Sequence, residues 1–156
     1  MIIIRRFNTD DAVTVSEMIA CTLRVSNSVD YASDYLEDLV LRHSPEFITD
    51  RALKTHFYVI EDGKEIVGCG AIGKIPGKED ESRLYTVFVS PEKQGKGLGR
   101  RLIGALEKDE LFIRARRVEV PASITALEFY KKLGYVTEDG VTGPDANGLY
   151  RLEKIK

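Results

Sequence analysis

The chain has 156 residues, 43% hydrophobic and 31% charged, and this composition predicts one globular domain over residues 1–156 with a substantial core. The formal net charge of −2 excludes the strongly basic field typical of nucleic-acid-binding proteins, so no nucleic-acid partner is expected. Because no hydrophobic run approaches the roughly 18 residues of a membrane span, no membrane association is expected either.

Cysteine and histidine are scarce. Cys21 and Cys69 lie far apart, and His43 and His56 are the only histidines, so we expect free thiols, structural histidines and no metal site. The N-terminal segment places its apolar residues before its arginines, unlike a signal peptide, which predicts a cytoplasmic protein. The sequence leaves the oligomeric state open, a homodimer included.

The N-terminal part predicts a strand followed by helices. Residues 2–7 form the expected strand, and capping side chains follow it directly. The apolar stripe over residues 13–23 predicts a first helix. A second helix is expected over residues 31–43, and a shorter one over residues 44–54, where a proline stands in the first turn.

The middle of the chain changes to a β pattern. Residues 56–75 read as two strands joined by an Asp-Gly turn at residues 62–63, which is a strong hairpin signal. After the polar stretch of residues 76–82, another strand is expected over residues 83–90. An amphipathic helix is predicted over residues 98–106.

The C-terminal part continues this alternation. It predicts a strand over residues 116–122, a helix over residues 123–135 and a last pair of strands over residues 135–138 and 148–154. The expected order is β-α-α-β-β-β-α-β-α-β-β. Because hairpins and strand–helix–strand units alternate, this order predicts an α/β fold with a mixed sheet.

A glycine-rich stretch, "VFVSPEKQGKGLGRRLIGALE", joins the strand over residues 83–90 to the next helix. Gly95, Gly97 and Gly99 would leave the free amides at the helix N-terminus open to a diphosphate. The spacing fits neither a Walker loop nor the dinucleotide fingerprint G-x-G-x-x-G. The alternative is an ordinary glycine-rich turn with solvated basic residues, which are Lys93, Lys96, Arg100 and Arg101.

This stretch resembles the acetyl-CoA-binding signature Q/R-x-x-G-x-G/A of the Gcn5-related N-acetyltransferases (GNATs). Gln94, Gly97 and Gly99 match it, and the element order resembles the fold of that family, whose central sheet is mostly antiparallel and flanked by helices. The resemblance implies a slot between the fourth and fifth strands that holds the pantetheine arm against the fourth. The cofactor-binding residues implied in this way are Phe88, Val89, Gln94, Gly95, Lys96, Gly97, Leu98, Gly99, Arg100 and Ser123.

A second motif, "SITALEFYKKLGY", resembles the later family pattern N-x-x-A-x-x-F-Y-x-x-x-G-F/Y, with Ser123 in place of the asparagine. The resemblance implies that Tyr130 is catalytic and hydrogen-bonds to the departing thiolate. The alternative is a core aromatic, because Tyr130 lies on a helical stripe with Phe129 and Leu133.

The general base is less well marked. Some family members use a glutamate at the position that matches Arg83, so the candidate here is Glu81, two residues earlier on the same strand face. A solvated charge beside a turn is the alternative reading of Glu81. Tyr85 is a second polar candidate, and Arg83 itself is a candidate contact for an acidic substrate group.

In this family the first two helices and the final strand pair shape the acceptor site, which here implies residues 27–35 and 141–149. Tyr31 and Tyr35, with two nearby aspartates, would form an acidic, aromatic wall suited to a cationic amine, although helix capping explains Asp30 equally well.

The resemblance implies an N-acetyltransferase that moves an acetyl group from acetyl-CoA to a primary amine of a small molecule or peptide. The amine would attack directly in a ternary complex, because no cysteine has a histidine near it in the sequence. The alternative is a non-catalytic domain that binds or senses coenzyme A.

Overall fold

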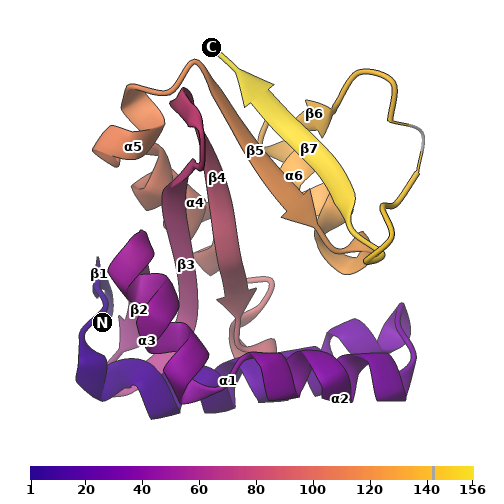
Figure 1. The fold of residues 1–156 in the computed structure, drawn as a ribbon. Helices are drawn as coiled ribbons and strands as arrows, with labels where there is room; N and C mark the ends of the chain where they lie inside the picture. The colour runs from indigo at the N-terminus through magenta and orange to yellow at the C-terminus, as the bar shows by residue number, and fades with distance from the viewer. Residues whose placement is uncertain (142) are drawn as a thin grey trace.

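The computed structural model describes residues 1–141 and 143–156. Among these residues, seven strands form one mixed sheet, antiparallel except between β4 and β5, in the order β1-β2-β3-β4-β5-β7-β6 (Figure 1). The strands are β1 (Ile2–Arg6), β2 (His56–Asp62), β3 (Glu65–Ile75), β4 (Lys78–Val89), β5 (Arg117–Ala122), β6 (Val136–Thr137) and β7 (Tyr150–Ile155). The expected α/β fold with a mostly antiparallel sheet is confirmed.

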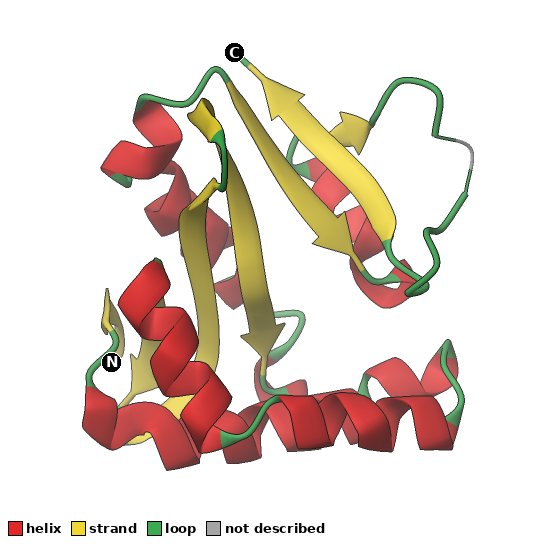
Figure 2. Ribbon diagram, in the orientation of Figure 1, coloured by secondary structure: helices red, strands yellow, loops and turns green. Residues whose placement is uncertain are grey.

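Helices cover both faces of the sheet (Figure 2). The helices are α1 (Ala12–Val25), α2 (Ser33–Arg42), α3 (Pro45–Lys54), α4 (Leu98–Glu107), α5 (Glu110–Ile113) and α6 (Leu127–Lys132). Short 3-10 turns are η1 (Thr9–Asp11), η2 (Asn27–Val29), η3 (Pro91–Lys93) and η4 (Ile124–Ala126).

Two hydrophobic cores lie on opposite faces of this sheet. Residues of α1, α2 and α3 pack with one set of strand side chains, and residues of α4, α5 and α6 pack with the other. Val59 and Ile60 show the alternation: they are neighbours on β2, both fully buried, and belong to different cores.

Two departures from the expected order concern helices. The expected order has two helices between the first two strands, whereas the structure has three; the third, α3, corresponds to the helix expected over residues 44–54 and is as long as α2. The four-residue α5 was not predicted, because it is too short for an apolar period to show. Its start is fixed by Asp109, whose carboxylate accepts a 2.9 Å hydrogen bond from the Leu111 amide.

The third departure is the start of β4, which begins at Lys78 inside the stretch expected to be a polar connection. Glu81 and Ser82 are buried there because each has a specific partner. Glu81 binds Arg117 at 2.8 Å, and the Ser82 hydroxyl donates a 2.7 Å hydrogen bond to the Leu111 carbonyl. Long-range pairing therefore makes a strand of residues whose local composition suggests a loop.

A β-bulge interrupts β4 at Thr86, whose φ of 55° lies in the left-handed region that non-glycine residues rarely adopt. The register against β3 changes there: Ala71 pairs with Tyr85, but Cys69 pairs with Phe88. The bulge places Tyr85 and Phe88 on the same face, toward α1 and α3, while Val87 and Val89 turn to the other core.

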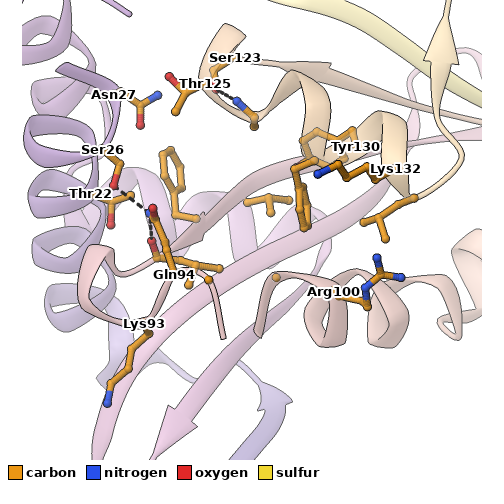
Figure 3. A pocket seen from close by; sticks show the side chains of 18 of the residues that line it. Thr22, Ser26, Asn27, Lys93, Gln94, Arg100, Ser123, Thr125, Tyr130 and Lys132 are labelled. Atoms are coloured by element: carbon orange, nitrogen blue, oxygen red, sulfur yellow. Dashed lines mark hydrogen bonds between the residues drawn. The ribbon is translucent and has the colours of Figure 1, made fainter. Parts of the chain in front are cut away.

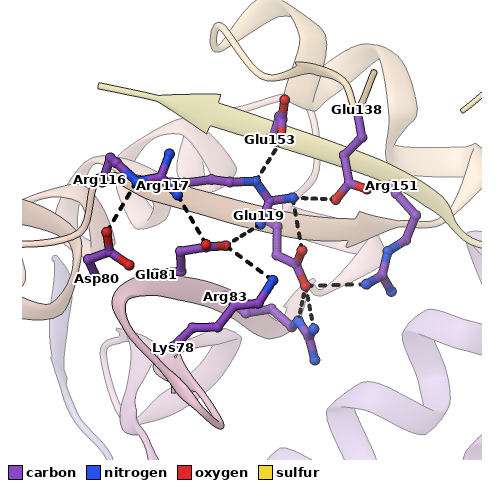
Figure 4. A network of polar contacts seen from close by, with 10 residues as sticks. All are labelled: Lys78, Asp80, Glu81, Arg83, Arg116, Arg117, Glu119, Glu138, Arg151 and Glu153. Carbon is purple, nitrogen blue, oxygen red and sulfur yellow. Dashed lines mark hydrogen bonds and ion pairs between the residues drawn. The ribbon is translucent and has the colours of Figure 1, made fainter. Parts of the chain in front are cut away.

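An ion network joins β4, β5 and β7 on one side of this bulge (Figure 4). Arg117, whose side chain is 14% exposed, contacts Glu81 at 2.8 Å, Glu119 at 3.1 Å, Glu138 at 2.5 Å and Glu153 at 2.6 Å. The network holds β4 against β5 at this end.

Candidate active site

The site lies where β4 and β5 separate. These parallel strands pair over only three residues each, from Glu81 with Arg117 to Arg83 with Glu119. Beyond that point they diverge, and α1 and α2 run across the open end (Figure 1). A cleft of about 640 Å³ occupies the opening and is lined by α1, β4, the glycine loop, α4, η4 and α6 (Figure 3).

The β4 wall of the cleft consists of Val87, Phe88 and Val89, so the structure brings both expected β4 residues to the site. The Gln94 side-chain amide donates to the Val89 carbonyl at 2.9 Å and to the Ser26 hydroxyl at 2.8 Å. Gln94 therefore links the glycine loop to the end of β4 and to α1.

Gly95 and Gly97 are glycines for conformational reasons. Their φ angles are 77° and 81°, in the region that disfavours side chains, and a Cβ added to either would meet no atom within 4 Å. Gly97 is the N-cap of α4, and no side chain of the described residues caps that helix. The first amides of this ten-residue helix are thus open to the cleft, as expected for anion binding.

Gly99 has a different reason to be glycine. Its φ is ordinary, but a Cβ there would lie 3.0 Å from the Phe129 ring of α6. The sequence predicted that all three glycines make room for a ligand; at Gly99 the room is taken by the packing of α6 against α4. Gly99 still lines the cleft.

The expected cations do not all reach the cleft. Arg100 lines it, whereas Lys96 and Arg101 are exposed and lie outside its lining. Lys93 is at the rim, paired with Asp62 at 3.2 Å, and this ammonium group lowers the pKa of Asp62. Leu98 lies outside the lining too, because its side chain is buried in the core.

Lys132 lines the cleft and was missed in the sequence. It follows Phe129 by three residues, the spacing that puts two side chains on one helix face, and this was the available signal. Thr22, Ser26 and Asn27 also line the cleft from α1 and η2. Nothing in the sequence pattern distinguishes them from the other polar residues of that segment.

Tyr130 belongs to both the core and the cleft. It is 4% exposed and packs edge-on against Phe129 and Tyr135, and it also lines the cleft. Burial raises the pKa of Tyr130, and its hydroxyl has no hydrogen-bond partner within the described part of the chain. By contrast, the Tyr135 hydroxyl donates to Glu107 at 2.9 Å. Tyr130 is thus a protonated donor available to a ligand.

Ser123 also reaches the cleft, and its hydroxyl accepts a 3.2 Å hydrogen bond from the Ala126 amide. This bond caps η4, the role that the sequence suggested for a serine in place of asparagine.

The expected base does not reach the site. Glu81 is buried outside the cleft lining and accepts hydrogen bonds from Arg116 at 3.1 Å and Arg117 at 2.8 Å. Each of the two carboxylate oxygens thus accepts a hydrogen bond from a guanidinium group. The geometry gives no support to Glu81 as a general base. Arg83 and Tyr85 lie outside the cleft lining as well.

The side chains expected to face the acceptor are engaged in contacts between segments. The Tyr31 hydroxyl donates to the Gly148 carbonyl and accepts from the Ile124 amide, both at 2.8 Å. Asp30 accepts a 2.8 Å hydrogen bond from Thr125. These contacts fasten the turn between η2 and α2 to η4 and to the loop before β7. Residue 142, in the other expected acceptor segment, lies outside the described residues.

Among the described residues, no helix combines the length and the apolar character that crossing a bilayer requires. Within residues 1–141 and 143–156, no three side chains of His, Cys, Asp or Glu are grouped so that they could hold a metal ion. Cys69 is fully buried, and burial raises the pKa of its thiol.

A protein family and several solved structures resemble this chain over more than half of its length. A family model described as the acetyltransferase (GNAT) domain matches residues 54–137, more than half of the chain. An N-acetyltransferase from Thermoplasma acidophilum, solved with coenzyme A, superposes with a TM-score of 0.85 at 18% identity over 100% of this chain and 99% of the other. A GCN5-related N-acetyltransferase from Rhodopseudomonas palustris gives 0.80 at 20% identity, over 99% and 95%.

A third similar structure is N-acetylglutamate synthase from Neisseria gonorrhoeae, solved with coenzyme A and N-acetyl-glutamate. It has a TM-score of 0.74 at 19% identity, and the match covers 99% of this chain and 35% of the synthase.

Proposed function

Because the chain belongs to the Gcn5-related N-acetyltransferase family, we propose that it transfers an acetyl group from acetyl-CoA to a primary amine, which attacks directly in a ternary complex. One observation carries the proposal: a single cleft joins an uncapped, glycine-flanked helix N-terminus to the unpartnered hydroxyl of Tyr130. Two of the similar structures are complexes with coenzyme A.

The cleft fits coenzyme A in two respects. The open amides at the start of α4 suit the diphosphate, with the charges of Arg100 and Lys132 beside them. The β4 backbone from Val87 to Val89 faces the gap left by β5, so it is free to pair with the amides of a pantetheine arm.

Acetyl-CoA supplies a thioester whose carbonyl carbon takes the amine nitrogen while the carbon–sulfur bond breaks. Tyr130 would donate a hydrogen bond to the sulfur as it becomes a thiolate. An ordinary tyrosine already has a pKa about 1.5 units above that of a thiol. Burial raises the pKa of Tyr130 further, so the hydroxyl stabilises the thiolate by a hydrogen bond rather than by full proton transfer.

The described residues that line the cleft include no carboxylate and no imidazole. The amine would therefore react as its neutral fraction and release a proton to water. At pH 7 this fraction is about a tenth for an amine of pKa near 8, and far smaller for a lysine side chain. An acceptor with a moderately basic amine suits the site better than a strongly basic one.

Initial-rate kinetics test the proposal. We expect thiol release from acetyl-CoA that depends on an added amine, with double-reciprocal plots that intersect as both substrates are varied. Parallel lines would indicate a covalent acyl-enzyme and contradict direct attack. Binding of acetyl-CoA without turnover on any amine would favour the alternative, a domain that only binds or senses coenzyme A.

A further inference from the structure

Arg51 is a half-buried cation without an acidic partner. It lies in the last turn of α3, and its guanidinium carbon is 4.2 Å from the centre of the Tyr85 ring and 5.1 Å from that of Phe47. Within the described residues it forms no ion pair. Burial lowers the pKa of Arg51, Tyr85 and Asp50 act in the opposite direction, and the charge of Arg83 lowers it slightly further.

A second guanidinium lies over the same ring. Arg83 is 5.6 Å from the centre of Tyr85, and its carboxylate partner, Glu119, is shared with Arg117 and Arg151. Figure 4 shows Arg83 and Arg151 converging on the one carboxylate of Glu119. Around Tyr85 itself, Arg83 is paired with Glu119, and Arg51 adds a second cation that forms no ion pair within the described residues.

This cationic patch, made of Arg51, Arg83 and the Tyr85 ring, adjoins the cleft. The bulge at Thr86 puts Tyr85 on the same strand face as Phe88, which lines the cleft. Tyr85 also stands just beyond Arg83, the last β4 residue that pairs with β5, so the patch begins where the two strands part.

Glu119 balances the charge of Arg83, whereas no described side chain forms an ion pair with Arg51. His43, which contacts both Phe47 and Phe88, adds no charge near pH 7 because burial lowers its pKa. Asp50, beside Arg51 in the chain, is paired with Lys54 at 3.1 Å. A partly desolvated guanidinium is costly unless it is paired, and a carboxylate matches its planar fork of donors.

We propose that the acceptor is an amine that also carries a carboxylate, an amino acid or a small derivative of one, with the carboxylate bound by Arg51 and Arg83 over the Tyr85 ring. This inference rests on the proposed acetyl transfer. The competing explanation is that Arg51 serves only packing, through its contacts with two aromatic rings.

Matched pairs of acceptors test the proposal: L-amino acids against their own carboxamides, with thiol release measured at saturating acetyl-CoA. The carboxamide keeps the amine and the side chain but loses the negative charge. It also has the less basic amine, which favours it in a site without a base. We expect the amino acids to have the higher kcat/KM. Equal or better acetylation of the carboxamides would overturn the proposal.

An Arg51→Met variant separates binding from packing, because methionine keeps an apolar side chain over the ring. We expect kcat/KM to fall about 10- to 100-fold for amino acids and to stay within about threefold for carboxamides, as for the loss of one charge-assisted hydrogen bond. Arg51→Lys should restore part of the difference. Arg114→Met, at an exposed arginine beyond α5, is the matched control and should change neither value. An equal loss for both acceptor classes would assign Arg51 to packing alone.

A binding measurement keeps this inference separate from the proposed function. If no amine is acetylated although acetyl-CoA binds, the proposed transfer is wrong. The carboxylate site is then judged by titrating the coenzyme A complex with N-acetyl amino acids and with their carboxamides. Tighter binding of the acids that Arg51→Met removes would support the site, whereas equal or undetectable binding of both would overturn it.

Discussion

The two ends of the β4–β5 pair differ in the groups that form them. At the closed end, the strands are held together by Arg117 among four carboxylates. At the open end, past the bulge at Thr86, apolar β4 residues face a cleft whose opposite rim is a loop with two left-handed glycines. The closed end sets the geometry with side-chain charge, and the open end presents backbone amides to a ligand.

This contrast shows why the carboxylates of this region are poor candidates for chemistry. Each is committed to a guanidinium that fixes a strand, as Glu81 is to Arg117. Within the described residues, the amides at the start of α4 have no side-chain cap and the Tyr130 hydroxyl has no hydrogen-bond partner, and both lie at the open end.

The largest effect is expected when a side chain enters the open end. Gly97→Glu would put bulk and negative charge at the start of α4, where several hydrogen bonds to phosphate would be lost together. We expect the affinity for acetyl-CoA to fall about 1,000-fold or more, measured by calorimetric titration.

Gly77→Glu is the matched control. Gly77 has the same φ of 81° and the same open surroundings, but it lies in the turn at the closed end. Both variants carry the same backbone strain and the same charge, so a difference in affinity isolates the ligand site. Similar affinities in the two variants would contradict the anion-binding role of the loop.

Disrupting the ion network at the closed end should reduce the stability of the fold rather than the affinity for acetyl-CoA. Arg117→Met would leave the carboxylates of Glu81, Glu119 and Glu153 without their shared partner. We expect the free energy of unfolding in urea to fall by about 3 kcal/mol. Arg116→Met removes the neighbouring arginine, whose side chain is 54% exposed, and should cost less than about 1 kcal/mol. Equal losses would mean that the network does not hold the strands.

A variant that removes the Tyr130 hydroxyl tests the side of the cleft formed by α6. Tyr130→Phe should lower kcat about 10- to 1,000-fold, because it removes the donor to the departing thiolate and little else. The affinity for acetyl-CoA should hardly change. Tyr135→Phe, which deletes a hydroxyl bonded to Glu107, is the control and should affect stability more than turnover. Unchanged turnover in Tyr130→Phe would refute its role.

The sequence predicted the features that depend on residues close together in the chain. Gly97 and Tyr130 both line the cleft. The glycines before the helix form a local pattern that pointed to Gly97, whereas Tyr130 was singled out by its resemblance to a family motif, since its helical stripe alone favours a core aromatic. Glu81 was misplaced because its burial depends on Arg117, a residue 36 positions later that only strand pairing brings near. No sequence pattern predicts the bulge at Thr86. Without knowledge of that bulge, the placement of Tyr85 and Phe88 on one strand face cannot be predicted.

The proposed acceptor site at Arg51 could not be predicted from the sequence for the same reason. Arg51 reads as an ordinary basic residue in the last turn of a helix, which is where such residues are favoured. Only the packing of α3 against β4 shows that it has aromatic neighbours and, in the described part of the chain, no ion-paired carboxylate.

A crystal structure of the protein with coenzyme A bound tests the central claim most directly. The account predicts the diphosphate within hydrogen-bonding distance of the amides of Leu98, Gly99 and Arg100, and the sulfur next to the Tyr130 hydroxyl. Coenzyme A bound elsewhere, or a cleft closed by the protein's own chain, would contradict it.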